Sequence, residues 1–460
     1  MNRYFFPPPL PHFSASGTTE ASRIIRSAYL KLAWSTSDRR RLIGYALATI
    51  AWPIVLVFTA ALATARSGQR VARTSGKPRW RQFCEQIWLG MVHTIRPRTY
   101  YVFELHDPAR FARAGSYLQR FETKGGLYSA LKNQSAPRGH RKCLRDKLRL
   151  FERCRALKIP TPRVLLALSD GGLLSLEHDG CDLPPADLFI KSRGGGGGKG
   201  AELWRHAGEV WTRRRDALDS DALLDRALRR SHGDPVIIQS ALRPHPAIAA
   251  LSVGALPTAR IVTIINERDE IEIAGAVFRM SVQPDIVVDN VHAGAIAAAI
   301  DANTGRLGLA TDIGHGPCSA WHEDHPVTGQ PIAGIVLPHW PAAVALARRA
   351  HRSMNDRPII GWDVAILQEG PVLIEGNGLP DLNVLQRCQR APAGDGRLGR
   401  LLAFHVERVL GHRPNPARPG DPIPDVANAG APHAHLVTSA SSGPRPSMQS
   451  RSRDGLARSR

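Results

Sequence analysis

Cysteine is scarce in this chain, and the few that are present follow no pairing pattern. The six cysteines are scattered, with no CxxC pair and no compact framework. This spacing argues against a disulfide-stabilised scaffold and indicates a reducing compartment. The first 30 residues also lack an apolar run ending in small-residue cleavage signals, so we expect no cleavable signal peptide.

Acidic residues are scarce near the N-terminus. The chain carries a net charge of +21, and its first 100 residues hold 15 Lys and Arg against three acids, Glu20, Asp38 and Glu85. The positive charge is therefore concentrated in one segment, which does not suit a nucleic-acid groove. Next to an apolar stretch, such a segment favours an anionic membrane surface, and we expect no nucleic-acid binding.

One long segment lacks charge altogether. Residues 42–65 contain no charged side chain and could cross a bilayer core, which needs about 20 apolar residues in a helix. We expect a transmembrane or interfacial helix within residues 39–70, since the central Trp52-Pro53 also suits an interfacial or buried helix. The following flank is more basic than Arg39-Arg40-Arg41, which places the rest of the chain at the cytoplasmic face of the inner membrane. Without a span, we expect a cytoplasmic protein.

Large apolar residues almost disappear after Arg413, where Pro, Ala, Ser, Gly and Arg predominate. We therefore expect residues 414–460 to be a disordered tail. Residues 1–38 read as a polar N-terminal segment with one helix near residues 21–34. Helical and strand patterns alternate from Cys143 to Arg413, which predicts an α/β (α+β) enzyme domain within residues 95–412.

A glycine-rich loop follows the strand-like run that contains Lys191. Its five consecutive glycines are Gly194, Gly195, Gly196, Gly197 and Gly198. A Walker A loop would need a Gly at Arg193 and a Ser or Thr at Gly200, and residues 201–205 read as a strand and not as the helix of a Rossmann fingerprint. The loop instead predicts the tip of a β-hairpin, whose backbone N–H groups, with Lys191 and Lys199, could close over phosphates; a flexible linker is the alternative.

A second hairpin carries acidic residues in otherwise apolar strands. A turn at residues 368–371 makes Asp363 and Glu375 cross-strand neighbours, and Asn377 projects from the same face. Clustered carboxylates in a Val- and Ile-rich strand are costly without a compensating cation. Oxygen ligands of this kind suit Mg²⁺ shared with nucleotide phosphates, which makes these three residues our candidate metal ligands.

With both features, the chain resembles the sugar-transfer-associated ATP-grasp family from about Tyr100 to Cys388. The resemblance implies an ATP-grasp fold, in which two α+β subdomains clasp ATP, with Mg²⁺ or Mn²⁺ as the metal. It also implies a role for Lys147, which follows Asp146 where a helix begins. Lys147 would contact ATP phosphate together with Lys191.

The same resemblance implies an adenine hinge, a short apolar strand followed by a polar residue and a leucine. The run from Val236 to Leu242 fits this description. Gln239 would bond the adenine amino group, Leu242 would pack on the ring, and His245 would reach the ribose. A glutamine in place of the glutamate of many relatives is a departure from the family pattern.

Two arginines, Arg260 and Arg279, occupy mostly apolar strands and need anionic partners. Bidentate binding of phosphate or carboxylate is the specialty of arginine, so both are candidate catalytic residues, although each could equally pair with a structural acid. Residues 288–294 resemble a family loop near the expected acceptor site. The group His315, Cys318, His322 and His325 does not match a common structural zinc pattern.

The family resemblance implies an ATP- and Mg-dependent ligase. A carboxylate donor would become an acyl phosphate, and an amine or a sugar hydroxyl would then displace phosphate. No Ser-His-Asp or Cys-His arrangement is present, which agrees with a reaction that needs no side-chain nucleophile. The family name suggests polysaccharide or glycoconjugate synthesis. A phosphotransferase that uses the same ATP site, and a non-catalytic nucleotide-binding component of a glycan assembly complex, are the alternatives.

Overall fold

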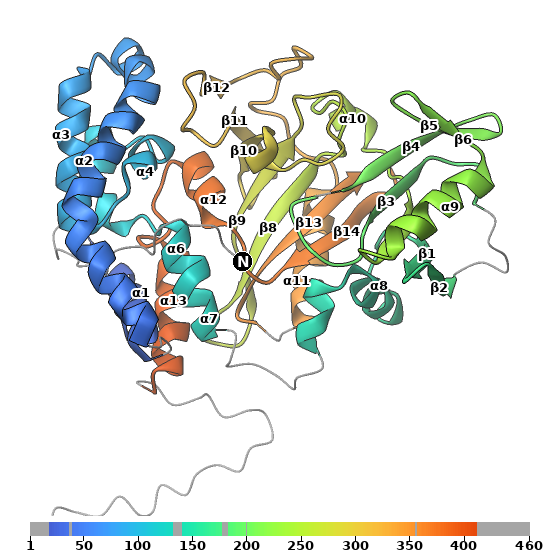
Figure 1. The fold of residues 1–460 in the computed structure, drawn as a ribbon, viewed down its shortest axis with the longest axis horizontal. Helices are drawn as coiled ribbons and strands as arrows, with labels where there is room; N and C mark the ends of the chain where they lie inside the picture. Colours follow the sequence, from blue (N-terminus) through green and yellow to red (C-terminus); the bar gives the residue numbers. More distant parts are fainter. Residues whose placement is uncertain are drawn as a thin grey trace, which may run out of the picture. The chain divides into compact units, whose positions relative to one another are not determined.

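A computed structural model describes residues 18–35, 39–131, 140–176, 183–198, 200–354 and 357–411. The expected tail, residues 414–460, lies outside this range. The described N-terminal part is helical (Figure 1). Its helices are α1 Glu20–Ser35, α2 Arg39–Ser75, α3 Arg79–His93, α4 Pro97–Val102, α5 Pro108–Ala112, α6 Arg120–Glu122 and α7 Tyr128–Leu131. Three short helical turns comprise Ala114–Ser116, Thr123–Leu127 and His140–Arg145. The expected helix near residues 21–34 corresponds to α1.

The first sheet is antiparallel and has the strand order β2-β1-β7-β3-β4-β5-β6. Its elements are β1 Val164–Ser169, β2 Gly172–Leu176, β3 Leu188–Ser192, β4 Glu202–Ala207, β5 Val210–Arg213, β6 Asp216–Leu218 and β7 Val236–Ser240, with helices α8 Lys147–Ala156 and α9 Ser220–Ser231. Side chains that alternate along the strands, among them Trp204, Ile190 and Ile238, pack in one cluster with Leu223 and Ala227 of α9. One apolar cluster therefore joins α9 to the sheet.

The second sheet, also antiparallel, has the order β12-β11-β10-β9-β8-β13-β14. Its elements are α10 Pro246–Ala249, β8 Thr258–Ile265, β9 Ile271–Met280, a turn at Val291–Ala293, β10 Ile296–Ile300, β11 Leu307–Thr311, β12 Trp321–His322, α11 Trp340–Ser353, β13 Ile359–Leu367, β14 Gly370–Asn377, α12 Leu382–Gln389 and α13 Arg397–Val409.

Both faces of this sheet are covered, which explains why every residue of β13 is buried. On one face Ile261 and Trp362 pack with Ala347 of α11. On the other face Val262 packs with Leu401 of α13, in a cluster that also holds Ile25 and Ala28 of α1. The N-terminal helix α1 is therefore part of the core that backs the second sheet.

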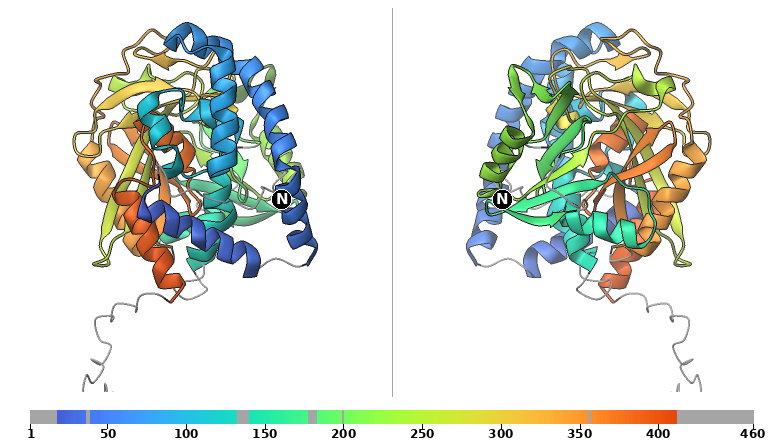
Figure 2. Two further views of the ribbon diagram at one scale, coloured as in Figure 1. Left: turned by 90° about the vertical axis from the view of Figure 1, so that its left-hand side faces the viewer. Right: turned by 90° about the vertical axis from the view of Figure 1, so that its right-hand side faces the viewer.

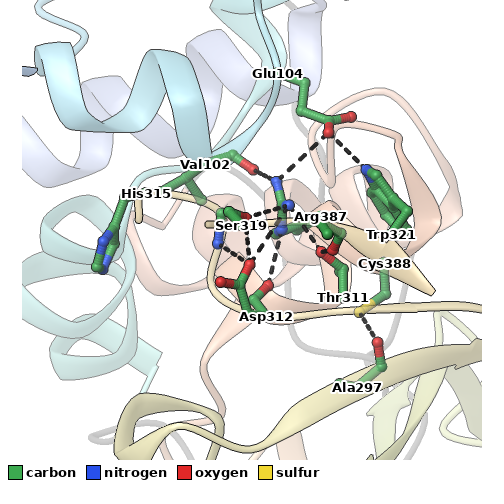
Figure 3. A network of polar contacts seen from close by, with 12 residues as sticks. Val102, Glu104, Ala297, Thr311, Asp312, His315, Ser319, Trp321, Arg387 and Cys388 are labelled. Carbon is green, nitrogen blue, oxygen red and sulfur yellow. Dashed lines mark hydrogen bonds and ion pairs between the residues drawn. The ribbon is translucent and has the colours of Figure 1, made fainter. Parts of the chain in front are cut away.

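A buried arginine ties the N-terminal helices to the second sheet (Figure 3). Arg387 of α12 donates to the carbonyl of Val102 at 2.7 Å, to the carbonyl of Asp312 at 2.9 Å and to the Thr311 hydroxyl at 2.8 Å. Glu104 lies 3.9 Å from its guanidinium and accepts a hydrogen bond from Trp321 Nε1 at 2.6 Å. This network crosses three separate segments of the chain.

The uncharged segment forms the middle of α2. Within the described residues, Leu42–Ser75 is the one stretch long and apolar enough to cross a membrane, with a mean hydropathy of 2.1 over an 18-residue window. Helices α2 and α3 run side by side in Figures 1 and 2, and Trp52 Nε1 donates to the Gly90 carbonyl of α3 at 2.9 Å. One side of α2 is therefore covered by protein.

Candidate functional site

A cavity of about 1770 Å³ is lined by residues of both sheets. The first sheet contributes β3, β7 and the glycine loop, and the second contributes β8, β9, β13 and β14. Most of the candidate residues line it, namely Lys147, Lys191, Gly194 to Gly198, Gln239, Leu242, Arg260, Arg279, Asp363, Glu375 and Asn377. Residues from distant parts of the sequence thus meet around one space.

The acidic hairpin pairs Asp363 with Glu375, but by a different route from the one expected. The turn contains only Gln368 and Glu369, because Leu367 already pairs with Gly370. A regular hairpin with this turn would set Asp363 opposite Ile374. A β-bulge between Asp363 and Val364 in the pairing makes Ile374 the extra residue and brings Glu375 opposite Asp363, with Asn377 opposite Gly361. The three candidate ligands consequently share one face.

A row of charged residues crosses four neighbouring strands at this point. Arg279, Arg260, Asp363 and Glu375 lie on β9, β8, β13 and β14, in the order in which these strands pair. Arg260 NH2 lies 2.8 Å and Arg279 NH2 3.0 Å from Asp363 Oδ2. The two arginines therefore have an acidic partner, and that partner is itself a candidate metal ligand.

These ion pairs set the ionisation of the buried acids. Burial by itself would raise the pKa of Asp363, but the guanidiniums of Arg260 and Arg279 outweigh it and hold the pKa below the usual range. Asp289 also contacts Arg279, at 3.1 Å; its burial and the nearby Asp363 carboxylate raise its pKa. Asp363 is thus the anion of the pair, which a metal ligand must be.

The other two candidate ligands differ in how their oxygens are used. The Glu375 carboxylate forms no hydrogen bond or ion pair with any described residue. The Asn377 side-chain oxygen accepts a hydrogen bond from the backbone N–H of Leu379 at 3.0 Å, which fixes its orientation. Two carboxylates and an amide oxygen on one face fit Mg²⁺, provided that Asp363 shares its oxygens with the arginines.

Lys191 projects from β3 into the cavity and is 9% exposed. Burial lowers the pKa of Lys191 to about 8, although Glu375 and Asp363 favour its charged form and Lys147 opposes it. Its ammonium lies 5.7 Å from the centre of the Phe189 ring and makes no ion pair with a described residue. A buried ammonium of this kind is well placed to receive an anionic ligand.

The glycine loop is the tip of the expected hairpin, since Leu188 pairs with Trp204 and Ile190 with Glu202. Lys147 Nζ donates to the carbonyls of Gly194 and Gly195 at 3.1 and 3.2 Å. The far side of the loop meets the second sheet's part of the cavity, where Asn290 Nδ2 donates to the Gly197 carbonyl at 3.4 Å. The loop therefore contacts both walls of the cavity, of which the first wall is formed by the first sheet and the second wall by the second sheet. Lys199 lies outside the described residues.

Two of the three adenine-hinge candidates line the cavity. Gln239 is buried and donates to the Pro162 carbonyl at 3.3 Å, and Leu242 follows β7. His245 is not among the lining residues. Its Nδ1 accepts a hydrogen bond from the backbone N–H of Ala247 at 3.1 Å and so caps α10, and its ring lies 5.6 Å from that of His339. His245 therefore has a capping role in this arrangement, and its contact with a ribose stays a prediction.

Several charged residues of the cavity were not anticipated. Arg230 of α9 donates to Ser192 at 3.3 Å, and Asp381, the N-cap of α12, accepts from His292 at 3.0 Å and lies 3.2 Å from Arg120. Burial would raise the pKa of Asp381, but His292, Lys124 and Arg120 hold it well below the usual range. Only His292 carried a sequence signal, through its position in residues 288–294, because the others read as ordinary helix residues.

His315 and His325 have partners in different parts of the chain. His325 Nε2 donates to the Ser281 carbonyl at 3.1 Å, and His322 lies on β12. Among the described residues, no group of three or more His, Cys, Asp or Glu side chains could hold a metal ion. The candidate set Asp363, Glu375 and Asn377 has only two such side chains, with an amide as the third ligand.

A known protein family matches the part of the chain that forms most of the cavity. A model of the sugar-transfer associated ATP-grasp family matches residues 127–394, and no curated protein matches the chain. The chain thus has the ATP-grasp type of fold. Because the match covers more than half of its length, it belongs to the sugar-transfer associated ATP-grasp family, which confirms the expected fold and family.

Solved structures that match part of the chain include three ligases or synthases. An L-amino acid ligase from Bacillus licheniformis is 11% identical with a TM-score of 0.34, over 63% of this chain and 53% of that one. A D-alanine–D-alanine ligase from Bacillus anthracis is 14% identical with a TM-score of 0.33, over 58% and 67%. An N5-carboxyaminoimidazole synthase from Aspergillus clavatus, solved with ADP, is 11% identical with a TM-score of 0.32, over 62% and 60%. The chain therefore spans little more than half the length of some of these proteins.

Proposed function

We propose that this protein is an ATP- and Mg²⁺-dependent ligase that activates a carboxylate as an acyl phosphate and transfers the acyl group to an amine or hydroxyl. The observation that carries the proposal is the row of charge across β9, β8, β13 and β14, which faces the buried Lys191 across one cavity. Cationic and anionic side chains at such close range suit a nucleotide polyphosphate with a bound metal. Family membership supports ATP as the nucleotide.

In this proposal the first wall of the cavity binds ATP. Lys147 and Lys191 neutralise phosphate charge, and the N–H groups of the glycine loop approach the phosphate oxygens. Gln239 and Leu242 bind the adenine from the hinge. Because the loop also contacts Asn290 on the opposite wall, it can exclude water from a hydrolysable intermediate.

In this proposal the second wall of the cavity binds the metal ion and the phosphoryl group that is transferred. Asp363, Glu375 and Asn377 would hold Mg²⁺, which supplies charge neutralisation between the phosphates. Arg260 and Arg279 exchange part of their contact with Asp363 for the γ-phosphoryl oxygens. A donor carboxylate oxygen attacks the γ-phosphorus, the bond to the β-phosphate oxygen breaks and ADP leaves. The acceptor then attacks the acyl carbon, releasing phosphate and a proton.

The setting we propose is polysaccharide or glycoconjugate synthesis at the cytoplasmic face of a membrane, with an amino acid as donor and a sugar as acceptor. The family description supports the sugar, and the apolar α2 with its basic flanks supports the membrane. A phosphotransferase would differ in one measurable way, since it would leave a stable phosphorylated product and need no amine.

The test is Mg·ATP binding by calorimetry, together with ADP release from a panel of amino acids and lipid-linked sugars and the product mass. The decisive variant is Glu375→Gln, because the Glu375 carboxylate forms no hydrogen bond or ion pair with a described residue and its loss should disturb folding little. We expect it to lower turnover by about a hundredfold or more. Asp363→Asn should act in the same direction.

A matched control is Asp216→Asn, which neutralises an exposed carboxylate on β6 away from the cavity. It should bind Mg·ATP as the parent chain does. If the parent chain bound no Mg·ATP, or if Glu375→Gln and Asp363→Asn both kept full binding and turnover, the proposal would be wrong.

A further inference from the structure

One side of α2 exposes a series of large apolar side chains. Six large apolar side chains, spaced three to four residues apart, form what we call the α2 stripe: Ile43, Leu47, Ile50, Ile54, Phe58 and Leu62. Ile50 is 76% and Ile54 is 78% exposed. Their spacing matches the helical period, so they lie on a single face. Exposed apolar surface of this extent marks an interaction site.

The opposite side of α2 is occupied by protein over most of its length. Trp52 bonds the Gly90 carbonyl, and a side chain at Gly90 would collide with Leu56, so α3 packs directly on this part of α2. Further along, Thr64 accepts from Gln86 at 2.8 Å, and Ser67 donates to the His315 carbonyl at 3.1 Å. From Trp52 onward, α2 is therefore fastened to the rest of the folded chain.

The packed neighbours do not suit the interior of a bilayer. Trp88 of α3 stacks on Phe111 with ring centres 5.4 Å apart, and beside Phe111 Arg110 forms an ion pair with Glu104. Glu104 and Arg110 act on the His106 ring together with Arg70 and Lys77, so this ion pair lies beside the end of α2 that follows the uncharged segment. Before Trp52, Tyr45 of α2 forms a side-chain hydrogen bond with Tyr29 of α1, and Tyr29 lies near Glu122 and Arg96. Charged groups therefore lie beside both ends of the uncharged segment, where a helix that crossed a bilayer would have to bring them to the lipid.

The charged residues that border the α2 stripe are all basic. Arg39 and Arg40 precede it, Arg66 and Arg73 follow it, and all four are exposed. The sequence from Arg39 to Cys84 contains no acidic residue. An apolar face bordered by arginines is the pattern of a helix that lies in the interface of an anionic membrane.

We propose that α2 docks the protein on an anionic lipid surface, lying in the plane of the membrane with the α2 stripe inserted and α3 directed away. This deepens the proposed membrane location and rests on it, but it is independent of the proposed catalysis. The arrangement holds the catalytic cavity at a constant position relative to the lipid, which suits acceptors that are themselves lipid-linked.

The first test is co-sedimentation of the full chain with vesicles of phosphatidylcholine, with or without an equal part of phosphatidylglycerol. We expect binding to the anionic vesicles that weakens with salt. The double variant Ile54→Glu/Phe58→Glu should lose about tenfold or more of this binding. The control Leu173→Glu/Val327→Glu adds the same charge at exposed apolar residues outside the stripe and should bind vesicles normally.

The second test separates docking in the plane from a span. Cysteines placed at Arg39 and at Arg73 are labelled with a membrane-impermeant maleimide in right-side-out and inverted membrane vesicles, and located by peptide mass spectrometry. In-plane docking makes both accessible from the cytoplasmic side only. Labelling of the two positions from opposite sides would overturn the inference. It would also be wrong if the parent chain did not bind vesicles but formed a dimer that Ile54→Glu/Phe58→Glu dissociates. Calorimetry with Mg·ATP on the same samples tests the proposed catalysis separately.

Discussion

At the scale of single residues, the site depends on charges held in unusual states. Lys191 is buried opposite Glu375 and Asp363 without an ion pair to either, and Asp363 is held ionised by two arginines. Removing an ammonium from water is costly, so the ligand-free protein tolerates Lys191 only with a depressed pKa. A polyphosphate would remove that cost by supplying the missing negative charge.

A pH dependence follows from Lys191. Its ammonium is present below a pKa of about 8 and is lost as the pH rises through that value. We therefore expect the affinity for Mg·ATP to fall by about tenfold between pH 7 and 9.5, because a hydrogen bond to a charged group contributes about 1.5–3 kcal/mol. Calorimetric titration across this range measures the effect.

The control for this prediction keeps the charge at high pH. Lys191→Arg should bind with an affinity that no longer falls above about pH 8, since a guanidinium stays protonated there. Lys31→Arg changes an exposed lysine of α1 in the same way and should retain the parent profile. A parent profile that stays flat across this range would contradict the assignment of Lys191 to the nucleotide.

At the scale of elements, the glycine loop must follow a backbone path that other residues resist. Gly195, Gly197 and Gly198 have φ angles of 73°, 76° and 70°. A side chain at Gly198 would meet Val288 Cγ1 at 2.4 Å, whereas one at Gly196 would meet nothing within 4 Å. The glycines are therefore not equivalent, although the sequence shows five identical letters.

This difference predicts a contrast between two alanine variants. Gly198→Ala should move the loop tip away from the second wall and raise the KM for Mg·ATP by about tenfold, because the left-handed conformation costs a non-glycine residue about 1–2 kcal/mol. Gly196→Ala, with neither a positive φ nor a clash, should leave KM nearly unchanged. Equal effects of the two variants would show that the loop does not close in this way.

At the scale of the whole molecule, Arg387 links the N-terminal helices to the second sheet. It is 3% exposed and bonds residues of two other segments, as Figure 3 shows. The N-terminal helices are thus joined to the strand layer by buried polar contacts as well as apolar ones. Loss of this side chain would leave buried carbonyls and carboxylates without their partner.

Arg387→Met should lower the free energy of unfolding by about 3–5 kcal/mol, the usual cost of removing one partner of a buried charge network. The matched variant Arg390→Met removes an exposed arginine that lies 4.0 Å from the Trp321 ring centre, and should cost about 1 kcal/mol or less. Urea denaturation followed by fluorescence measures both. Similar losses for the two variants would contradict the structural role of Arg387.

Much of the fold was readable from local pattern. The apolar alternation predicted the α/β domain, the glycine run predicted the hairpin tip between β3 and β4, and Asp363, Glu375 and Asn377 were expected on one face. The family match supports the same fold. These features depend on residues close in sequence, whose period and spacing can be read without the tertiary fold.

Other features arose only from packing between distant segments. The bulge at Ile374 was not predictable, since a two-residue turn and a four-residue turn suit the same sequence. The pairing of Arg260 and Arg279 with Asp363 requires three strands to lie in a set order. Lys124 and Asp381 line the cavity from segments far apart in the sequence, and they lie 3.8 Å from each other.

The sequence by itself determined that residues 42–65 form an uncharged helix with basic flanks and that carboxylates gather on a strand hairpin, because composition and period are local properties. The tertiary structure decided which side of that helix α3 covers and which side remains open. It also decided which charges face the nucleotide cavity. Burial and ion pairing depend on what packs nearby, and only the folded chain brings those neighbours together.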